Sequence, residues 1–534
     1  MSLSTLTLPD GISFIPITEW ENRHQNFRVT FAKDACFNMR LPFPFDEHAK
    51  NYEATTKNFQ WLIRYAIERG LRLRALGGGW SFTDVAVGDG IVDTRELRDF
   101  YNINESFLSP QYLANGGKSS NLIFAQCGMS MLQISRELEK ENGWFQSLKA
   151  SGASNGQTVA GATSTGTHGS AYKVGAVHDT IIGMHMITGP DKHVWLEKAS
   201  NPVASPDFIE WLNAELVQDD DIFNSAVVSF GSFGFIHSLL IETEPVFLLE
   251  KHTSANIPYN DDLKTAINTL DFTRIEKFLP YPLNAQNPPL YHFELLFNPH
   301  QFALNDAAKG VYFKLMYKIP FTPDYEKPAE NEKYQYGDEL LGIIQTVLDR
   351  LPNILQQHLV PALVTKLLPE AFVAGEITKG TVGETFGNTK IRGQAASAAI
   401  GIDSKDASRV LEEIININKQ TPFAGAAALR FVKGTKALLG FTRFPVTCVL
   451  ELDGVESQTS RNFFNKVWNR LEELGIPYTL HWGKINFNLN KERVRLMYGD
   501  NNVDTWMESR KKLLDVSSRK VFTNHFMIRC GLDE

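Results

Sequence analysis

A run of small residues between positions 157 and 170 constrains this chain more than any other feature. It holds glycines, hydroxyl residues and one histidine, with almost no large apolar side chain (Gln157-Thr-Val-Ala-Gly-Ala-Thr-Ser-Thr-Gly-Thr-His-Gly-Ser170). Glycine lets the backbone approach a ligand closely, and hydroxyls and free backbone N–H groups donate to anionic oxygens. The run predicts a loop that wraps a polar, phosphorylated ligand. An ordinary surface turn is the alternative that this run alone leaves open.

A second glycine-rich loop lies upstream, in Leu76-Gly-Gly-Gly-Trp-Ser-Phe82. The strand-like run Leu71–Ala75 leads into it, and Gly90–Asp93 has the pattern of the next strand. Before both, Thr55–Arg69 carries apolar residues at helical spacing. A loop between such elements is where a phosphate-gripping segment is expected. It fits neither G-x-x-x-x-G-K-S/T nor G-x-G-x-x-G, which argues against a P-loop ATPase and a Rossmann dinucleotide domain.

Five segments, in order, resemble the FAD-binding domain of the vanillyl-alcohol oxidase / p-cresol methylhydroxylase (PCMH-type) flavoprotein superfamily. They are Leu73–Phe82, Phe124–Leu132, Thr158–Ser170, Val228–Ile236 and Ile241–Pro245. The resemblance covers about residues 20–248 and implies a two-subdomain FAD-binding domain. It also implies which residues contact FAD: Leu76, Gly77, Gly78, Gly79, Trp80, Ser81, Phe82, Thr158, Gly161, Ala162, Ser164, Thr165, Gly166, Thr167, His168, Gly169, Gly234, Ile236 and Asn524.

The composition changes after Pro245, and residues 249–500 mix strand-like and helical runs. This mixture predicts an antiparallel sheet with helices, an α+β cap that holds the substrate. Residues 501–534 are expected to return to the FAD domain. Strands are expected at Tyr291–Phe297, Val311–Ile319, Val446–Leu452 and Pro477–His481, and helices at Leu263–Leu270, Ser404–Lys419, Ser460–Leu474 and Val503–Leu514.

Two later segments resemble aldonolactone and alditol oxidases of the same superfamily, a resemblance that extends to type II cholesterol oxidases. The segments are Leu480–Lys484 (Leu-His-Trp-Gly-Lys) and Val521–Phe526, the latter carrying Asn524. Arg430 falls where that subgroup has a Glu-x-Arg motif beside the flavin, but Ala428 stands where its glutamate would be. The departure points away from a sugar-type substrate.

Four residues are the catalytic candidates. Lys484 is either a solvated lysine at the end of a strand or, as the resemblance implies, stabilises the negative charge of a reduced flavin. Arg430, a lone charge on an apolar strand, either pairs with Glu451 or faces the active site, and both can hold. Glu451 and Asp453 share one face of a strand, and one such carboxylate either helps remove the substrate hydroxyl proton or is a salt-bridge partner. His481 either acts as a base or fixes its strand, and His168 either contacts the cofactor or packs its loop.

Non-covalent attachment of FAD is the expected mode. Many superfamily members carry a histidine after the glycines and join it to the flavin 8α-methyl group. Trp80 occupies that position here, and indole does not form that bond under ordinary conditions. The other anchor of the superfamily is a cysteine in the second loop, and Thr158–Ser170 contains none.

An insertion at residues 320–397 is the least typical part of the chain. Its section Asp338–Phe372 is strongly apolar, and Pro352, Pro361 and Pro369 are expected to cut it into short helices. The sequence leaves three interpretations open: extra core, a dimer surface, or an apolar lid over a bulky substrate. Peripheral contact with a membrane would go with the lid, and the oligomeric state is not fixed.

Composition limits the remaining classes. The 534 residues have a net charge of −8 and no basic cluster, so nucleic-acid binding is not expected. The four cysteines are dispersed, which indicates neither a metal site nor a disulfide framework. No signal peptide and no apolar run of membrane-spanning length is found, so a cytoplasmic location is the default expectation.

Together these features predict an FAD-dependent oxidoreductase that converts a CH–OH group to a carbonyl, with a bulky, apolar, sterol-like alcohol as the favoured substrate. O2 or another carrier would accept the electrons. A polyol or aldonolactone oxidase or dehydrogenase is one alternative. A flavin-binding protein without catalysis is the other.

Overall fold

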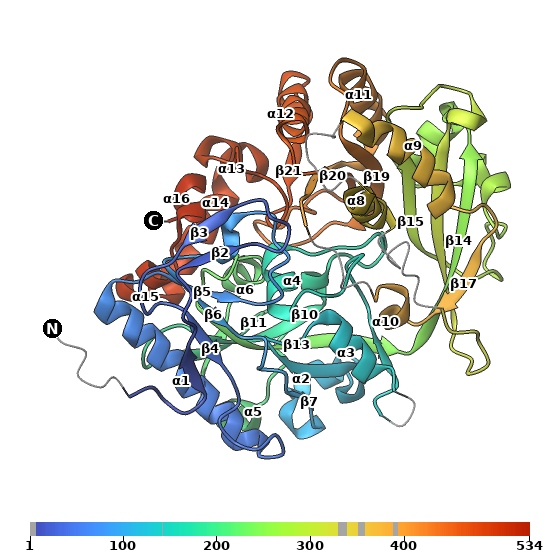
Figure 1. Cartoon of the computed structure of the whole chain (residues 1–534). Coiled ribbons are helices and arrows are strands. Elements are labelled where there is room, and N and C mark those ends of the chain that lie inside the picture. The colour runs from blue at the N-terminus through green and yellow to red at the C-terminus, as the bar shows by residue number, and fades with distance from the viewer. Residues whose placement is uncertain (1–6, 141–142, 329–338, 351–357, 388–392, 534) are drawn as a thin grey trace.

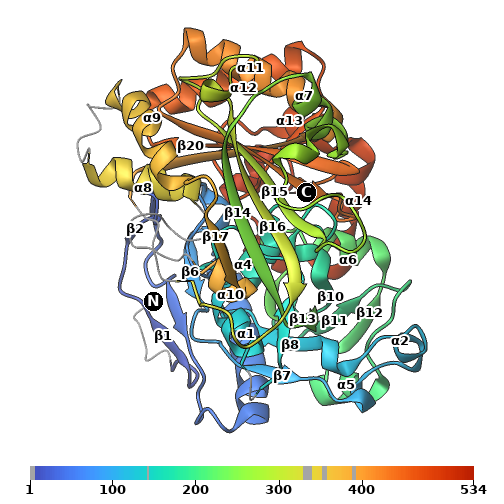
Figure 2. The ribbon, with the colours of Figure 1, turned by 90° about the vertical axis from the view of Figure 1, so that its right-hand side faces the viewer.

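The structure is a computed structural model of the chain, and it describes residues 7–140, 143–328, 339–350, 358–387 and 393–533. Its first region, up to Pro245, contains a four-stranded and a seven-stranded sheet, and its second is built on an antiparallel eight-stranded sheet (Figures 1 and 2). One hydrophobic core runs through both regions. The expected α+β architecture is confirmed.

The glycine loop is positioned by a helix packed on the four-stranded sheet. Helix α1 (His48–Arg69) buries an apolar face that includes Phe59, Leu62 and Ala66, and Gly70 ends it with φ 64°. Strands β5 and β6 are parallel, so the loop leaves the carboxyl end of β5. The order of the sheet is β1 (Ile12–Phe14), β4 (Phe37–Met39), β6 (Gly90–Asp93) and β5 (Leu73–Leu76).

The seven-stranded sheet carries the second loop, and here the sequence expectation needs correction. About half of the run 157–170 is a short helix, α4 (Val159–Thr165), with Thr158 at its N-cap and Gly166 at φ 79° after its end. Val159 and Ala162 are buried in the core, because small neighbours let the helix pack closely. The sheet order is β12 (Glu215–Gln218), β11 (His193–Glu197), β10 (Ile181–Ile187), β13 (Phe235–Pro245), β8 (Leu122–Gln126) and β7 (Phe100–Asn102), with β9 (Gln146–Leu148) paired to β13.

The eight-stranded sheet contains every strand expected in the cap, each within three residues of its predicted ends. Helices α7 (Asp261–Thr269), α11 (Ala407–Gln420) and α12 (Gln458–Glu473), all expected, lie together over one end of it (Figure 2). The strand order is β17 (Ile377–Gly380), β14 (Phe247–Ile257), β16 (Val311–Pro320), β15 (Leu290–Phe297), β19 (Gly425–Lys433), β20 (Val446–Val455), β18 (Ala395–Asp403) and β21 (Tyr478–Leu480).

The apolar section of the insertion contains, among its described residues, the helices α8 (Glu339–Arg350) and α9 (Val360–Ala371), which pack against β19 and β20, and the short helix α10 (Val382–Thr385) follows them. Prolines divide it less than expected, because Pro361 lies in the first turn of α9, where no helical N–H bond is lost, and Pro369 lies inside the helix near its end. Asp338 and Pro352 lie outside the described residues. Helices α8 and α9 share an apolar core with the sheet, formed by Leu296, Leu340, Ile343, Val347, Val360, Val364, Leu367, Leu368, Ala371, Phe372, Ala424, Ala426, Ala428 and Val455.

The C-terminal segment returns to the first region. Trp506 in α14 (Asp500–Leu513) donates its indole N–H to Ser225 O at 3.1 Å. Asn524 caps α16 (His525–Cys530) and donates its amide to the carbonyls of Val85 and Val87 at 3.1 and 2.9 Å. In Figure 1 these terminal helices lie beside the strands of the N-terminal region.

Three histidines, of which His185 and His237 are buried, lie where α1 covers the seven-stranded sheet. His185 Nε2 is 2.9 Å from His193 Nδ1, and Tyr52 of α1 bonds His185 Nδ1 at 2.7 Å. His237 Nε2 is 2.9 Å from the Thr55 hydroxyl. Burial lowers the pKa of His237 to about 3 and the pKa of His185 well below its ordinary value. The folded chain therefore holds these rings uncharged.

This cluster predicts lower stability in mild acid. The unfolded histidines take up protons below about pH 6.5 and the folded ones do not, so their contribution is present above that pH and is lost as pH falls toward the folded pKa. We expect the thermal unfolding midpoint to fall from pH 7 to pH 5. His237→Gln should weaken this dependence, whereas the exposed His525→Gln should not. An equal slope in the parent and His237→Gln would contradict the assignment.

Candidate active site

The two predicted loops contact each other at their glycines. A Cβ atom at Gly77 would lie 2.0 Å from Thr158 Oγ1, and one at Gly78 would lie 2.6 Å from Gly156 O. Only glycine permits this approach, which brings the first loop against the start of α4. The backbone of the loop is thereby held open toward the space between the two regions.

That space is a cavity, partly open to solvent, and it runs from the glycine loops to the cap sheet. Ala162, Gly166, Gly169 and Asn524 do not line it: Ala162 lies in the core, Gly166 and Gly169 shape the second loop, and Asn524 supports residues 84–87 from behind. The sequence-predicted residues that do line it are Leu76, Gly77, Gly78, Gly79, Trp80, Ser81, Phe82, Thr158, Gly161, Ser164, Thr165, Thr167, His168, Gly234, Ile236, Arg430, Glu451, His481 and Lys484.

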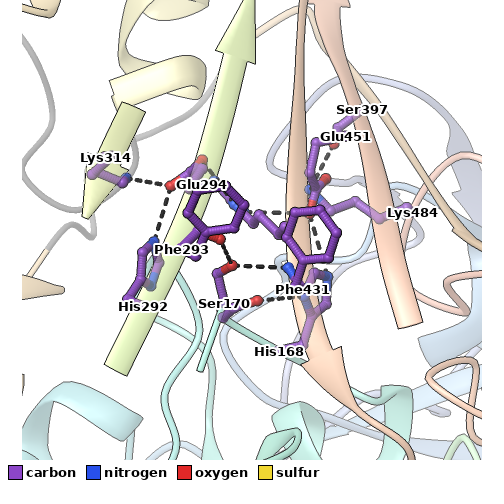
Figure 3. A network of polar contacts seen from close by, with 12 residues as sticks. His168, Ser170, His292, Phe293, Glu294, Lys314, Ser397, Phe431, Glu451 and Lys484 are labelled. Atoms are coloured by element: carbon purple, nitrogen blue, oxygen red, sulfur yellow. Dashed lines mark hydrogen bonds and ion pairs between the residues drawn. The ribbon is translucent and has the colours of Figure 1, made fainter. Parts of the chain in front are cut away.

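Arg430 of β19 is held between two carboxylates. Its Nε donates to Glu294 Oε1 at 2.9 Å and its Nη1 to Glu451 Oε1 at 3.3 Å (Figure 3). All three side chains are at most 4% exposed. Burial alone raises the pKa of the Glu451 carboxyl, but Lys484 and Arg430 outweigh burial and hold that pKa well below its usual range. Both sequence interpretations of Arg430 therefore hold, because it pairs with Glu451 and lines the cavity.

Glu294 was not found by sequence reasoning. Its Oε2 accepts from Lys314 Nζ at 2.7 Å and lies 3.2 Å from His292 Nε2. Burial raises its pKa, while Arg430 and Lys314 lower it more, so the pKa stays well below the usual value. These partners come from β15 and β16, far from β19 in the sequence, and each carries its charge into an apolar run with no local signal.

Lys484 and His168 reach the same carboxylate from the other side. Lys484 Nζ lies 3.6 Å from Glu451 Oε2 and donates to Ser397 Oγ at 2.6 Å. His168 Nε2 lies 3.3 Å from Glu451 Oε1, and its Nδ1 lies 2.9 Å from Gly169 O. Both nitrogens of His168 thus face oxygen acceptors. Among the described residues, the cavity wall carries Arg430 and Lys484 beside the carboxylate of Glu451.

Neither His481 nor Asp453 takes part in the contacts around Arg430 described above. His481 is buried, and its Nδ1 accepts from Gly483 N at 2.9 Å, which shapes the turn that carries Lys484. Burial, with His168 and Lys484, lowers the pKa of His481 well below its ordinary value. This contact matches the strand-fixing interpretation. Asp453 is buried on β20 but does not line the cavity.

Ser170 joins the second loop to the cap sheet. The ladder between β15 and β19 ends at the pair Glu294–Arg430. The next residues, Phe293 and Phe431, are bridged by Ser170, whose Oγ donates to Phe293 O and accepts from Phe431 N at 2.9 Å (Figure 3). The end of the second loop therefore lies between β15 and β19, next to Glu294 and Arg430.

Several cavity residues were missed by sequence reasoning. Gly152, Ala153 and Ser154 come just before the second loop, residues 157–170, and share its composition, which was the available signal. Leu341 reaches the cavity from α8. Cys127 also lines it, and burial raises the pKa of its thiol to about 12.

The donor set fits FAD. Glycines without side chains, the hydroxyls of Thr158, Ser164 and Thr165, and backbone N–H groups suit a diphosphate. At the cap end, Arg430 and Lys484 suit the electron-rich ring of a flavin. The described part of the chain contains no helix that is long and apolar enough to cross a membrane.

Comparisons with known proteins agree with this arrangement. Residues 53–197 match a family model described as an FAD binding domain. An L-gulono-1,4-lactone dehydrogenase of Mycobacterium tuberculosis is 21% identical over 430 residues, which are 80% of this chain and 84% of that protein. A long-chain alcohol oxidase of an uncultured marine euryarchaeote is 34% identical over 128 residues, 22% of this chain and 24% of its own. Cholesterol oxidase from B. sterolicum has a TM-score of 0.68 at 15% identity, covering 96% of each chain.

The fold and the cavity define an FAD-dependent oxidoreductase. The family match covers residues 53–197 and agrees with the resemblance of the loops to the vanillyl-alcohol oxidase / p-cresol methylhydroxylase flavoprotein superfamily.

The contact between Gly77 and Thr158 generates a prediction for cofactor binding. Gly77→Ala places a methyl group against Thr158 and should separate the two loops, lowering FAD affinity by about tenfold or more, which corresponds to about 1.4 kcal/mol. Flavin content and a fluorescence titration of apoprotein measure this. Gly70→Ala is the control, because it has no neighbour within 4 Å and costs only backbone strain of about 1–2 kcal/mol. Equal flavin affinity in both variants would remove the loop from the cofactor site.

Proposed function

We propose that this protein oxidises the CH–OH carbon of a bulky, apolar alcohol to a carbonyl, using non-covalently bound FAD. The carrying observation is one cavity that joins the glycine loops, a buried cationic wall with Glu451, and an apolar side chain from the insertion. The names of the relatives, a lactone dehydrogenase, a long-chain alcohol oxidase and a cholesterol oxidase, support a CH–OH donor.

FAD, when bound, accepts the carbon-bound hydrogen and its electron pair at flavin N5. The residues of the chain do the rest. Arg430 and Lys484 stabilise the negative charge that develops as the electrons arrive, and they need no rearrangement because Glu294, Ser397 and Glu451 already hold them. O2 or another carrier accepts the electrons afterwards.

The substrate class follows from the cap side of the cavity. Leu341 of α8 lines it, and Ala428, beside Arg430 on β19, is buried under the insertion helices. A polyol would leave its hydroxyls against this apolar wall without partners. The resemblance to the lactone dehydrogenase keeps a lactone or polyol as the second candidate. The costly buried charges around the cavity favour an enzyme over a flavin-binding protein without catalysis.

A substrate series tests this assignment. Each methylene buried in an apolar channel contributes about 0.8 kcal/mol, so KM should fall about fourfold per added methylene until the channel ends. Leu341→Asp should raise KM for long alcohols more than for short ones. Leu363→Asp, on α9 but away from the cavity, is the matched control and should leave the chain-length preference unchanged. Peroxide release and dye reduction report turnover. Best turnover with a small polyol would overturn the apolar assignment.

The non-covalent attachment rests on Trp80 and Cys127. Trp80 lines the cavity, with Gly156 against its ring and the Arg23 guanidinium 4.5 Å from the ring centroid. Cys127 lines it too, but its raised pKa keeps the thiol protonated and unreactive. Oligomeric state and contact with a membrane surface stay predictions.

Acid precipitation of the yellow holoprotein tests the attachment. Because neither side chain is a competent nucleophile, we expect all of the flavin in the supernatant, measured by its absorbance and by the mass of the precipitated chain. Colour retained in the pellet, or a chain heavier by one flavin, would contradict it.

A further inference from the structure

Glu451 stands out among the residues that line the cavity. Among those described, it is the one acid, and its two oxygens differ. Oε1 is occupied by Arg430 and His168. Oε2 is enclosed and accepts no hydrogen bond from the described residues, although Lys484 Nζ lies 3.6 Å away. A buried carboxylate oxygen that accepts no hydrogen bond is costly, and a donor that approached Oε2 through the cavity would remove that cost.

The strand register explains how this carboxylate reaches the cavity. Glu451 of β20 is the direct partner of Ala428 of β19, so both side chains project from the same face. Arg430 lies two residues after Ala428 and shares that face as well. Glu451 can therefore contact Arg430 diagonally across the strands, with Arg430 Nη1 3.3 Å from Glu451 Oε1.

The small side chain of Ala428 lies in the region of β19 on which α8 packs. Ala428 belongs to the apolar core that α8 shares with the sheet, together with Leu340, Ile343 and Val347. The same helix turns Leu341 into the cavity. The apolar wall and the carboxylate thus lie side by side, because α8 packs on β19 and the neighbouring strand β20 carries Glu451.

We propose that Glu451 Oε2 accepts the substrate hydroxyl proton from β20, and that Ala428 leaves the facing position on β19 to α8 so that an apolar substrate body lies against that carboxylate. The inference rests on the proposed alcohol oxidation and assigns a role within it. The O–H bond breaks, its electrons form the second C–O bond, and the proton joins Oε2. The carbon-bound hydrogen leaves with its electron pair for the flavin.

The charges around Glu451 keep its carboxylate ionised before the proton is transferred. Lys484 and Arg430 keep the pKa of Glu451 low against the effect of burial, so the carboxylate is ionised when an alcohol binds. An ionised carboxylate only accepts hydrogen bonds, which favours an alcohol over a ketone. After proton transfer the carboxyl group donates to the new carbonyl. Binding preference and proton transfer therefore come from the same atom.

Glu451→Gln tests the proton-accepting role while keeping the shape of the side chain. We expect flavin content near that of the parent and flavin reduction by alcohol slower by about 100-fold or more. The parent rate should show no acidic limb between pH 5 and 8. Lys484→Met removes one neighbouring cation, so an acidic limb should move up toward this range. Parent-like reduction by Glu451→Gln would overturn the inference, whereas a parent flavin that no alcohol reduces would overturn the proposed function instead.

If no alcohol reduces the flavin of the parent, a binding experiment can still test the role of Glu451. With the flavin reduced by dithionite, alcohol and ketone of one carbon skeleton are titrated by their effect on the flavin spectrum. The parent should prefer the alcohol. Glu451→Gln should lose or reverse the preference, because its amide donates to a carbonyl. Equal preferences in both proteins would remove Glu451 from the substrate site.

The position of the carboxylate on β20 instead of β19 is tested by moving it from residue 451 to residue 428. Ala428→Glu/Glu451→Ala should reduce flavin at least tenfold faster than Ala428→Gln/Glu451→Ala, which has the same size without the charge. Because Glu at 428 can displace α8 and prevent folding, added formate should also rescue the single variant Glu451→Ala. Absence of both the effect of moving the carboxylate and formate rescue would refute the role of a carboxylate at this position.

Discussion

The position of Arg430 between Glu294 and Glu451 is the interaction on which the rest of the site depends. One guanidinium links β15, β19 and β20 across their shared face, and its fork geometry suits two carboxylates at once. Removing one partner of a buried pair typically costs about 3–5 kcal/mol, because the remaining charge is left in a poorly solvating interior. Lys314, Lys484 and His168 complete the network, so no carboxylate is left without a cation.

This network also joins the two regions of the molecule. His168 and Ser170 belong to the loop after α4, yet they bond Glu451 and the ends of β15 and β19. The loop that shapes the cofactor end of the cavity is therefore fixed to the strands that carry its charges. A shift between the regions would break buried hydrogen bonds, so the distance from cofactor to substrate is set by the same contacts that hold the interface.

Sequence reasoning found what depends on local pattern. The glycine loops, β6 and most of the cap strands could be placed because glycine clusters and apolar periodicity are local signals. It did not find Glu294, Lys314 or the direct pairing of Ala428 with Glu451, because these follow from register between distant strands. It missed β18 for another reason: Ala395–Asp403 is rich in alanine, whose strand propensity is weak, and tertiary packing alone makes it a strand.

The alanines of the cap sheet and the large side chains of the insertion pack against each other. Ala426 and Ala428 of β19, with Ala424 just before the strand, alternate along the chain and leave a shallow surface, into which α8 and α9 place leucine, isoleucine and valine. Neither surface is stable alone, since an alanine face buries little area and two apolar helices need a cover. Among the described residues of the insertion, the sides of α8 and α9 that face the sheet belong to an apolar core, whereas Leu341 of α8 lines the cavity. Because α8 packs on β19 and β20, the position of Leu341 in the cavity wall is set by the packing of the sheet.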